Sequence, residues 1–184
     1  MRWMRERLNE EEGFTLIELM VVVLIIAVLV AIAVPSFLGF RNRAQDRAAQ
    51  AELRNVLLAE KAFWTDFGEY AYAGASYDFD GDGTTTTAQE HLKGYEPSIE
   101  ISATAADSLV AIDPSGVYQS VLANNDAVCI VKVASSGNEF AIFEDASATG
   151  GTFYWSGAEG TAPCPAGAGD PGGTWSTNGF PAGP

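Results

Sequence analysis

An unbroken apolar segment near the N-terminus is the strongest pattern in this chain. Residues 14–34 contain one charged side chain, Glu18, and are otherwise almost entirely apolar. At about 1.5 Å per residue, a helix of this length is just long enough to cross the hydrocarbon core of a bilayer. A carboxylate placed there costs on the order of several kcal/mol unless it meets a partner, so Glu18 is a candidate functional residue.

A helical pattern continues after Pro35 to about Asp66. Apolar side chains recur on one face, with Arg, Gln, Asp and Glu opposite, and we expect this face to dock on a sheet. The pattern predicts one helix of about 50 residues, with a bend or a melted turn at Pro35 and Gly39. The expected docking face consists of Phe37, Phe40, Ala44, Ala48, Ala51, Leu58 and Ala62, widened by Leu53, Leu57 and Trp64.

A polar loop over residues 67–98 leads into short apolar segments that are typical of strands. The sequence Ser-Ser-Gly-Asn at 135–138 is a turn signal that joins two of them in a hairpin. The expected fold class is α+β, with a long N-terminal helix packed on a small antiparallel β-sheet of three to five strands over 99–155. Residues 156–184 are so rich in Gly and Pro that we expect a mostly irregular tail without a packed core, tied down by Cys164. The candidate strands are 99–101, 109–112, 117–122, 127–134, 139–144 and 152–155.

The N-terminal segment is open to three interpretations. A cleavable secretory signal would account for Ala-Ile-Ala at 31–33, but the apolar run exceeds the usual length of about 7–15 residues. An uncleaved membrane anchor would account for the length and leave Glu18 without a partner. The third interpretation rests on Gly-Phe-Thr-Leu-Ile-Glu at 13–18, followed by Leu-Met-Val-Val-Val. This stretch resembles the type IV prepilin signature, which type IV pilins share with type II secretion pseudopilins.

The resemblance implies roles for four residues. A dedicated membrane peptidase would cut after Gly13 and methylate the new N-terminus on Phe14. Glu18 would then pair with the N-terminal amine of a neighbouring subunit, although a contact with the chain's own amine is also open. Pro35 falls where the family often has a helix-loosening proline. An ammonium beside a carboxylate in low dielectric removes much of the burial cost of each, and methylation keeps the positive charge.

The same resemblance divides the chain into segments. Residues 1–13 would be a leader, in which three glutamates at 10–12 replace the basic residues of many family leaders, so peptidase recognition could differ in detail. The remaining segments are a membrane-spanning and filament-core helix at 14–35, an amphipathic helix at 36–66, a variable loop at 67–98, the pilin-like sheet at 99–155 and the tail at 156–184.

The charge of the chain excludes one class of partner. Its formal net charge is −14, so we expect no direct binding to nucleic acid or to anionic lipid headgroups through bulk electrostatics. Arginines flank the apolar run on both sides, so positive charge alone leaves the membrane topology ambiguous. They are Arg2, Arg5 and Arg7 before the run and Arg41, Arg43, Arg47 and Arg54 after it.

Cys129 and Cys164 both lie in the part that would be exported, where an oxidising environment favours pairing. A disulfide between them would contribute about 3 to 4 kcal/mol through the closed loop, and two free buried thiols are the alternative. In type IV pilins the region bounded by a disulfide is often exposed on the filament, and here its bounds would be these two cysteines.

The variable loop carries a spacing of aspartates that is typical of calcium-binding loops. Three carboxylates at alternate positions can converge on one cation, and Gly83 permits the sharp turn that presents a backbone carbonyl. The motif expects glutamate at its twelfth position, where this chain has Gln89, so binding would be weaker unless Glu90 reaches in. A turn whose side chains bond only their own backbone is the alternative. The candidate ligands of a structural Ca²⁺ are Asp78, Asp80, Asp82, Thr84 and Glu90.

No catalytic motif stands out. The chain has one histidine, His91, and lacks a P-loop, a dinucleotide fingerprint, a zinc pattern and a nucleophile elbow, so we expect no enzyme. The resemblance implies the subunit of a type IV pilus, a single-pass membrane protein that assembles into a homo-oligomeric helical filament on the cell surface. Its partners would be the prepilin peptidase, an inner-membrane assembly platform and a cytoplasmic ATPase.

Two other functions remain open at this stage. The first is the major pseudopilin of a type II secretion system, a branch with a calcium-stabilised loop. The second is a membrane-anchored exported binding domain that never polymerises.

Overall fold

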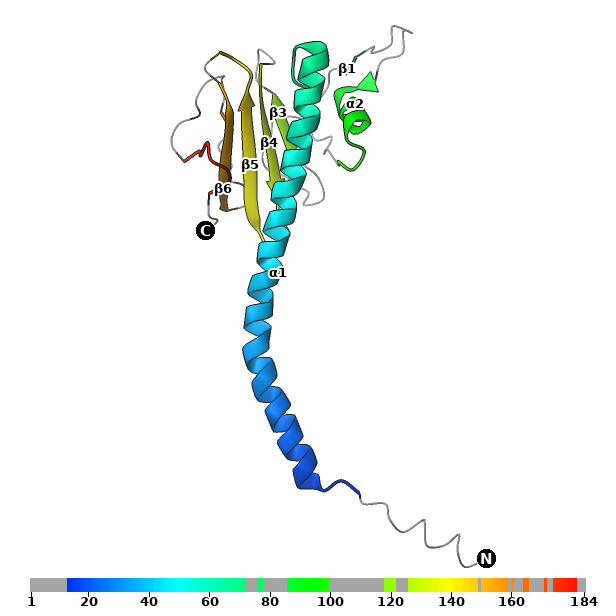
Figure 1. Ribbon diagram of the computed structural model, residues 1–184, viewed down its shortest axis with the longest axis vertical. Coiled ribbons are helices and arrows are strands. Elements are labelled where there is room, and N and C mark those ends of the chain that lie inside the picture. The colour runs from blue at the N-terminus through cyan, green and yellow to red at the C-terminus, as the bar shows by residue number, and fades with distance from the viewer. Residues whose placement is uncertain are drawn as a thin grey trace, which may run out of the picture. The chain divides into compact units, whose positions relative to one another are not determined.

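The fold is described from a computed structural model, which confirms the expected α+β class. A 52-residue helix precedes a four-stranded antiparallel meander in the order β3-β4-β5-β6, and β1 and β2 pair separately (Figure 1). The elements are α1 (Leu16–Phe67), β1 (Ser76–Tyr77), β2 (Thr86–Thr87), α2 (Ala88–Tyr95), β3 (Tyr118–Val121), β4 (Ala127–Val133), β5 (Asn138–Asp145) and β6 (Thr152–Ala158). The structure describes residues 13–71, 76–77, 86–99, 118–121, 126–148, 150–158, 160, 164–165, 171 and 174–181.

Helix α1 passes through Pro35 and Gly39 without interruption, so the expected melted turn does not occur. A proline removes one N–H donor, and the hydrogen bonds of the flanking turns keep the helix continuous. The helix ends where Gly68 adopts a positive φ of 73° and donates its N–H to the carbonyl of Trp64 at 2.8 Å. This left-handed cap needs a residue without a Cβ, which explains why the helix stops there.

The helix face that docks on the sheet differs from the expected one. Leu53 and Leu57 are buried as expected, but Leu58 is 66% exposed, and Ala44 and Ala51 are also exposed. The expectation was wrong because apolar residues follow helical spacing on two faces, while the face that docks has a glutamate, Glu60, in its centre. The buried residues of α1 are Ala49, Leu53, Val56, Leu57, Ala59, Glu60 and Phe63.

Polar contacts fix the direction in which the C-terminal part of α1 runs along the sheet. Near the start of β5, the side-chain amide of Asn138 donates to Asp46 at 3.1 Å, and near its end Lys61 pairs with Glu144 at 2.8 Å. The two helix residues are about 22 Å apart at 1.5 Å per residue, and the two strand residues are about 20 Å apart at 3.4 Å per residue. Matching lengths mean that residues 46–61 of α1 run in the same direction as β5.

Apolar residues cover both faces of the sheet. Val128 and Ile130 of β4 pack in the layer under α1, while the alternating Cys129 and Val131 pack in a second layer on the opposite face. All seven residues of β4 are therefore buried. This explains why the strand reads as a nearly continuous apolar run instead of alternating with polar residues.

The C-terminal tail contributes to both layers, contrary to the expectation of a tail without packing. The ring centroid of Trp175 lies 6.1 Å from that of Phe143 in the outer layer. In the layer under α1, the ring of Phe180 packs edge-on against that of Phe140, with 5.6 Å between the ring centroids. The guanidinium carbon of Arg54 lies 5.2 Å from the centroid of the Phe180 ring. Two large aromatic side chains supply apolar area that the Gly and Pro content of the tail concealed.

Other sequence expectations have mixed outcomes. The predicted hairpin at 135–138 is confirmed, because β4 and β5 pair antiparallel and Gly137 has a φ of 90°. Helix α2 was not expected within the loop over 67–98. Ile99 is buried but lies outside any strand, and the other residues of the two earliest candidate strands, 99–101 and 109–112, fall outside the described residues.

Candidate functional site

The first turn of α1 is closed by a reciprocal contact between Thr15 and Glu18. The backbone N–H and the hydroxyl of Thr15 donate to Glu18 Oε2 at 2.8 and 2.7 Å. In return, the N–H of Glu18 donates a hydrogen bond to Thr15 Oγ1 at 3.3 Å. This is a capping box, in which the residue before the helix and the third residue of its first turn satisfy each other's polar groups.

The capping box supplies a partner for Glu18 inside one chain, and sequence reasoning missed it. The signal was present, because Thr-Leu-Ile-Glu at 15–18 matches the Ser/Thr-x-x-Glu pattern of a helix start. The exposed Phe14 precedes the cap directly. An amine on Phe14 would therefore lie about one helical turn from the carboxylate of Glu18, at the same end of the helix.

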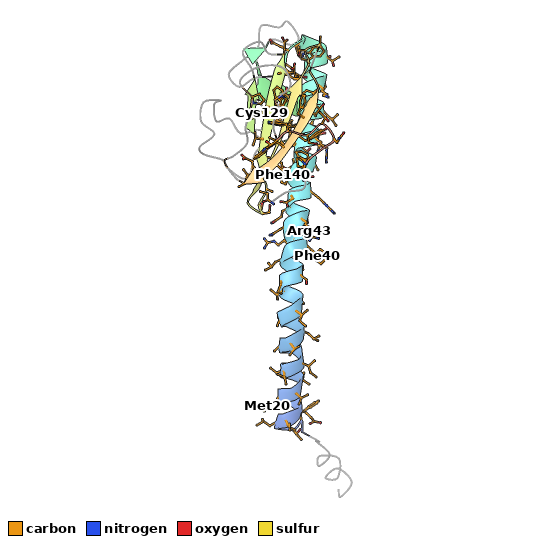
Figure 2. The ribbon with its side chains drawn as sticks, turned by 90° about the vertical axis from the view of Figure 1, so that its left-hand side faces the viewer. Met20, Phe40, Arg43, Cys129 and Phe140 are labelled. Carbon is orange, nitrogen blue, oxygen red and sulfur yellow. A yellow bond between two sulfur atoms is a disulfide. The ribbon has the colours of Figure 1, made fainter. Side chains whose placement is uncertain are left out.

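The helix that follows presents apolar side chains to its surroundings on every side. Each large apolar residue from Leu16 to Phe40 is at least 48% exposed, and Figure 2 shows such side chains projecting from α1 between Met20 and Phe40. An 18-residue stretch of this apolar part of α1 has no residue buried within the chain. By length and composition this segment can cross a membrane.

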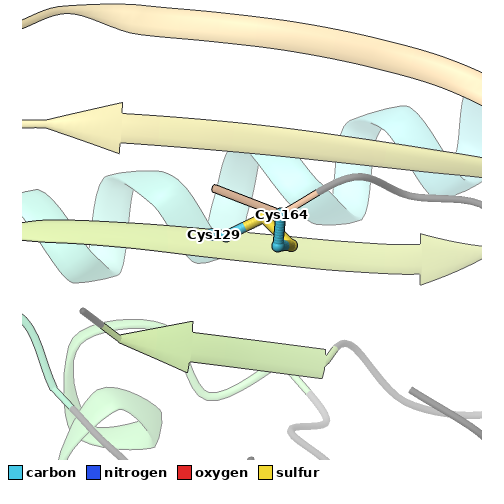
Figure 3. Close-up of a disulfide and its surroundings, with 2 residues drawn as sticks. All are labelled: Cys129 and Cys164. Carbon is cyan, nitrogen blue, oxygen red and sulfur yellow. A yellow bond between two sulfur atoms is a disulfide. The ribbon is translucent and has the colours of Figure 1, made fainter. Parts of the chain in front are cut away.

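The two cysteines are joined. Cys129 on β4 and Cys164 form a disulfide with a Cα–Cα distance of 5.8 Å, and among the described residues no cysteine is free (Figure 3). The bond closes a loop with a sequence separation of 35 that contains β5 and β6. It holds the segment around Cys164 against the outer apolar layer, together with Trp175.

Most of the predicted calcium loop lies outside the described residues, namely Asp78, Asp80, Asp82 and Thr84. Glu90 is described and sits exposed in the first turn of α2. Within the described part of the chain, no group of three or more His, Cys, Asp or Glu side chains could hold a metal ion. Calcium binding stays a prediction.

Comparison with known proteins bears on the segment that contains the capping box. Residues 8–34 match the prokaryotic N-terminal methylation motif, which places Gly13, Phe14 and Glu18 inside the matched region. Together with the curated relatives, this match supports the type IV prepilin family. The chain resembles three curated proteins over part of its length, and no solved structure matches it significantly.

All three relatives are named as pilins or as a pilus component. The chain is 44% identical over 59 residues to the type IV major pilin protein PilA of Myxococcus xanthus, covering 32% of this chain and 27% of the relative. It is 36% identical over 63 residues to the type IV wide pilus major component PilA4 of Thermus thermophilus, covering 34% and 48%. It is 44% identical over 46 residues to the type IV major alpha-pilin of Moraxella bovis, covering 25% and 29%. The matches thus span about a quarter to a half of each relative.

Proposed function

We propose that this chain is a type IV prepilin, the structural subunit of a type IV pilus filament. It is made as a membrane-anchored precursor, cleaved after Gly13, methylated on the amine of Phe14 and polymerised into a surface filament. The observation that carries the proposal is the position of the cleavage site relative to α1. The helix starts at Leu16, so cleavage leaves it intact and creates an ammonium one turn from Glu18.

Glu18 has a partner before and after assembly in this scheme. In the stored subunit, the N–H and hydroxyl of Thr15 hold its carboxylate. In the filament, the methylated ammonium of a neighbouring subunit takes part in the contact, and in low dielectric a carboxylate binds a charged donor more strongly than the neutral donors of Thr15. An uncleaved subunit lacks that ammonium, so only processed chains add well to the filament.

Assembly requires partners that supply energy and processing. The sequence has no P-loop that would let the chain hydrolyse a nucleotide itself. We therefore infer a cytoplasmic ATPase acting through an inner-membrane platform, together with a prepilin peptidase. Before assembly the subunit is held by its apolar helix as a single-pass membrane protein. The aspartates of the variable loop would bind a structural Ca²⁺ on the exported side, where this ion is plentiful.

The named relatives favour a pilus over a secretion pseudopilus. All three are described as components of type IV pili, and none is described as a pseudopilin. The calcium-like spacing is the one feature that pointed to the pseudopilin branch. It lies in a loop outside the described residues and carries no weight against the N-terminal matches.

Electron microscopy of sheared surface material tests the proposal. Wild-type cells should yield filaments, and Glu18→Ala should leave cleavage normal while strongly reducing filament yield, because the assembly contact is lost. Glu96→Ala is the matched control, since this partly exposed glutamate accepts hydrogen bonds from the nearby Ser98. Full filament yield from a normally cleaved Glu18→Ala chain would refute the role given to Glu18.

A further inference from the structure

We propose that Asn178 is a site of spontaneous deamidation, and that the isoaspartate formed there releases the end of the C-terminal tail from the core. Asn178 and Gly179 lie in a bend of the tail, between Ser176 and Phe180. Of the seven asparagines in the sequence, Asn178 is the only one that glycine follows. The reaction needs neither a partner chain nor a filament, so it goes beyond the proposed function.

Deamidation at this position is an attack of the backbone on a side chain. The amide nitrogen of Gly179 forms a bond to the side-chain carbonyl carbon of Asn178, and the side-chain nitrogen leaves as ammonia together with the proton of the Gly179 N–H. Water then opens the cyclic succinimide at either of its carbonyl carbons. One opening gives aspartate, and the other gives isoaspartate, in which the main chain continues through the former side chain.

Both reacting groups are accessible. Asn178 is exposed, and within the described part of the chain neither its side-chain amide nor the N–H of Gly179 makes a hydrogen bond. Gly179 has a φ of 111°, and a Cβ at this position would have no atom within 4 Å. Because glycine has no side chain, nothing on Gly179 itself hinders the approach of its nitrogen to the side chain of Asn178.

Two anchors hold the backbone on either side of this dipeptide. On one side, Ser176 and Tyr154 of β6 exchange two backbone hydrogen bonds of 2.8 and 2.9 Å. On the other side, the ring of Phe180 packs edge-on against that of Tyr154, with 5.1 Å between the ring centroids. The carbonyl of Pro181 accepts a hydrogen bond from the hydroxyl of Ser156 at 3.2 Å. The backbone of residues 177–179 therefore spans two fixed points.

Isoaspartate lengthens the main chain by one atom between these two anchors, so both cannot keep their native contacts. The anchor at Ser176 is the stronger, because two backbone hydrogen bonds and the packing of the adjacent Trp175 hold it. We therefore expect Phe180 to leave its place beside Phe140 of β5 and Arg54 of α1. The folded domain then loses the apolar contacts of a large aromatic side chain and becomes less stable.

Incubation of the purified full-length chain in detergent at mildly alkaline pH tests the modification. Cleavage before Asp170 releases a peptide, residues 170–184, whose only asparagine is Asn178. Mass spectrometry with separation of the isomers should show loss of the side-chain amide from this peptide, with isoaspartate among the products. Asn138 is the internal control and should stay intact, because its side-chain amide donates to Asp46 at 3.1 Å and glutamate follows it. A peptide that keeps its amide, or loses it no faster than Asn138 does, would overturn the proposed site.

Two variants at the same position test the release of the tail. Asn178→Gln keeps an amide on a longer side chain, which closes the ring poorly, so this variant should resist modification. The melting temperature of wild type should fall after the incubation, whereas that of Asn178→Gln should not change. Fresh Asn178→Asp carries the charge of the product on a main chain of normal length, and it should melt like fresh wild type. Aged wild type that contains isoaspartate but melts like the fresh protein would overturn the release of Phe180.

Discussion

Glu18 accepts two hydrogen bonds from Thr15, at 2.8 Å from its N–H and 2.7 Å from its hydroxyl. Removing the hydroxyl deletes one of these bonds and the return contact to the N–H of Glu18. Thr15→Ala should therefore loosen the first turn by about 1 kcal/mol. Faster hydrogen exchange at the amides of residues 16–19 in detergent would report this. Thr15→Ser keeps the hydroxyl and should exchange like wild type; equal exchange in all three proteins would contradict the cap.

A buried carboxylate anchors the segment after α1. Glu60 is fully buried and accepts a hydrogen bond from the N–H of Ala71 at 3.0 Å. Glu60→Ala removes this acceptor and leaves a cavity, so the free energy of unfolding should fall by about 2–4 kcal/mol.

Urea unfolding of the purified mature protein measures this loss. Glu60→Gln keeps an acceptor of the same size and should lose less stability. Leu58→Ala on the exposed side of the same helix is the matched control and should change stability little. A loss for Leu58→Ala as large as that for Glu60→Ala would contradict the assignment of the buried face.

Ionisation of Tyr95 should lower the stability of the folded protein at alkaline pH. Burial, followed by its hydrogen bond to Asp66, raises the pKa of Tyr95 to about 12. The folded state therefore holds the phenolic proton more tightly than the unfolded state, whose pKa is about 10. This contribution to stability is complete below pH 10 and is lost as the pH rises from about 10 to 12.

Tyr95→Phe removes the group that titrates, so its stability should fall less steeply over this range. The measurement is urea unfolding from pH 9 to pH 12 for both proteins, with ultraviolet titration of the tyrosines. Parallel stability curves for the two proteins would contradict the raised pKa.

Calcium should stabilise the mature protein if the aspartate loop binds it. Three carboxylates within a short loop repel each other, and a cation between them removes the repulsion. Added Ca²⁺ should raise the melting temperature, and Asp80→Ala should abolish the increase. Asp126→Ala, at an exposed site outside the motif, should respond like wild type. Equal melting temperatures with and without Ca²⁺ in the wild-type protein would end this prediction.

The sequence predicted the elements better than their packing. Helix α1 and the hairpin at 135–138 followed from periodicity and turn chemistry, which are local properties. The docking face of α1 did not, because Leu58 is apolar but exposed, and Glu60 is charged but buried. Burial of these two residues depends on what lies across from them, which a single sequence does not contain.

The candidate site also contains residues that the sequence identifies and contacts that it does not. Gly13, Phe14 and Glu18 could be singled out because their spacing is a local signature, and Thr15 could have been found from the capping pattern. The tail contacts could not, since Phe180 meets β5 and α1 only through the folded chain. Gly and Pro content indicated irregular backbone there but said nothing about where its aromatic side chains lie.

The central claim is that cleavage after Gly13 makes the N-terminus that the filament uses. Intact mass and N-terminal sequencing of sheared surface filaments test it most directly. The account predicts a chain that begins at Phe14 and carries one added methyl group on its amine. Filaments whose subunits retain the leader, or begin after the Ala-Ile-Ala sequence at 31–33 and so lack Glu18, would contradict it.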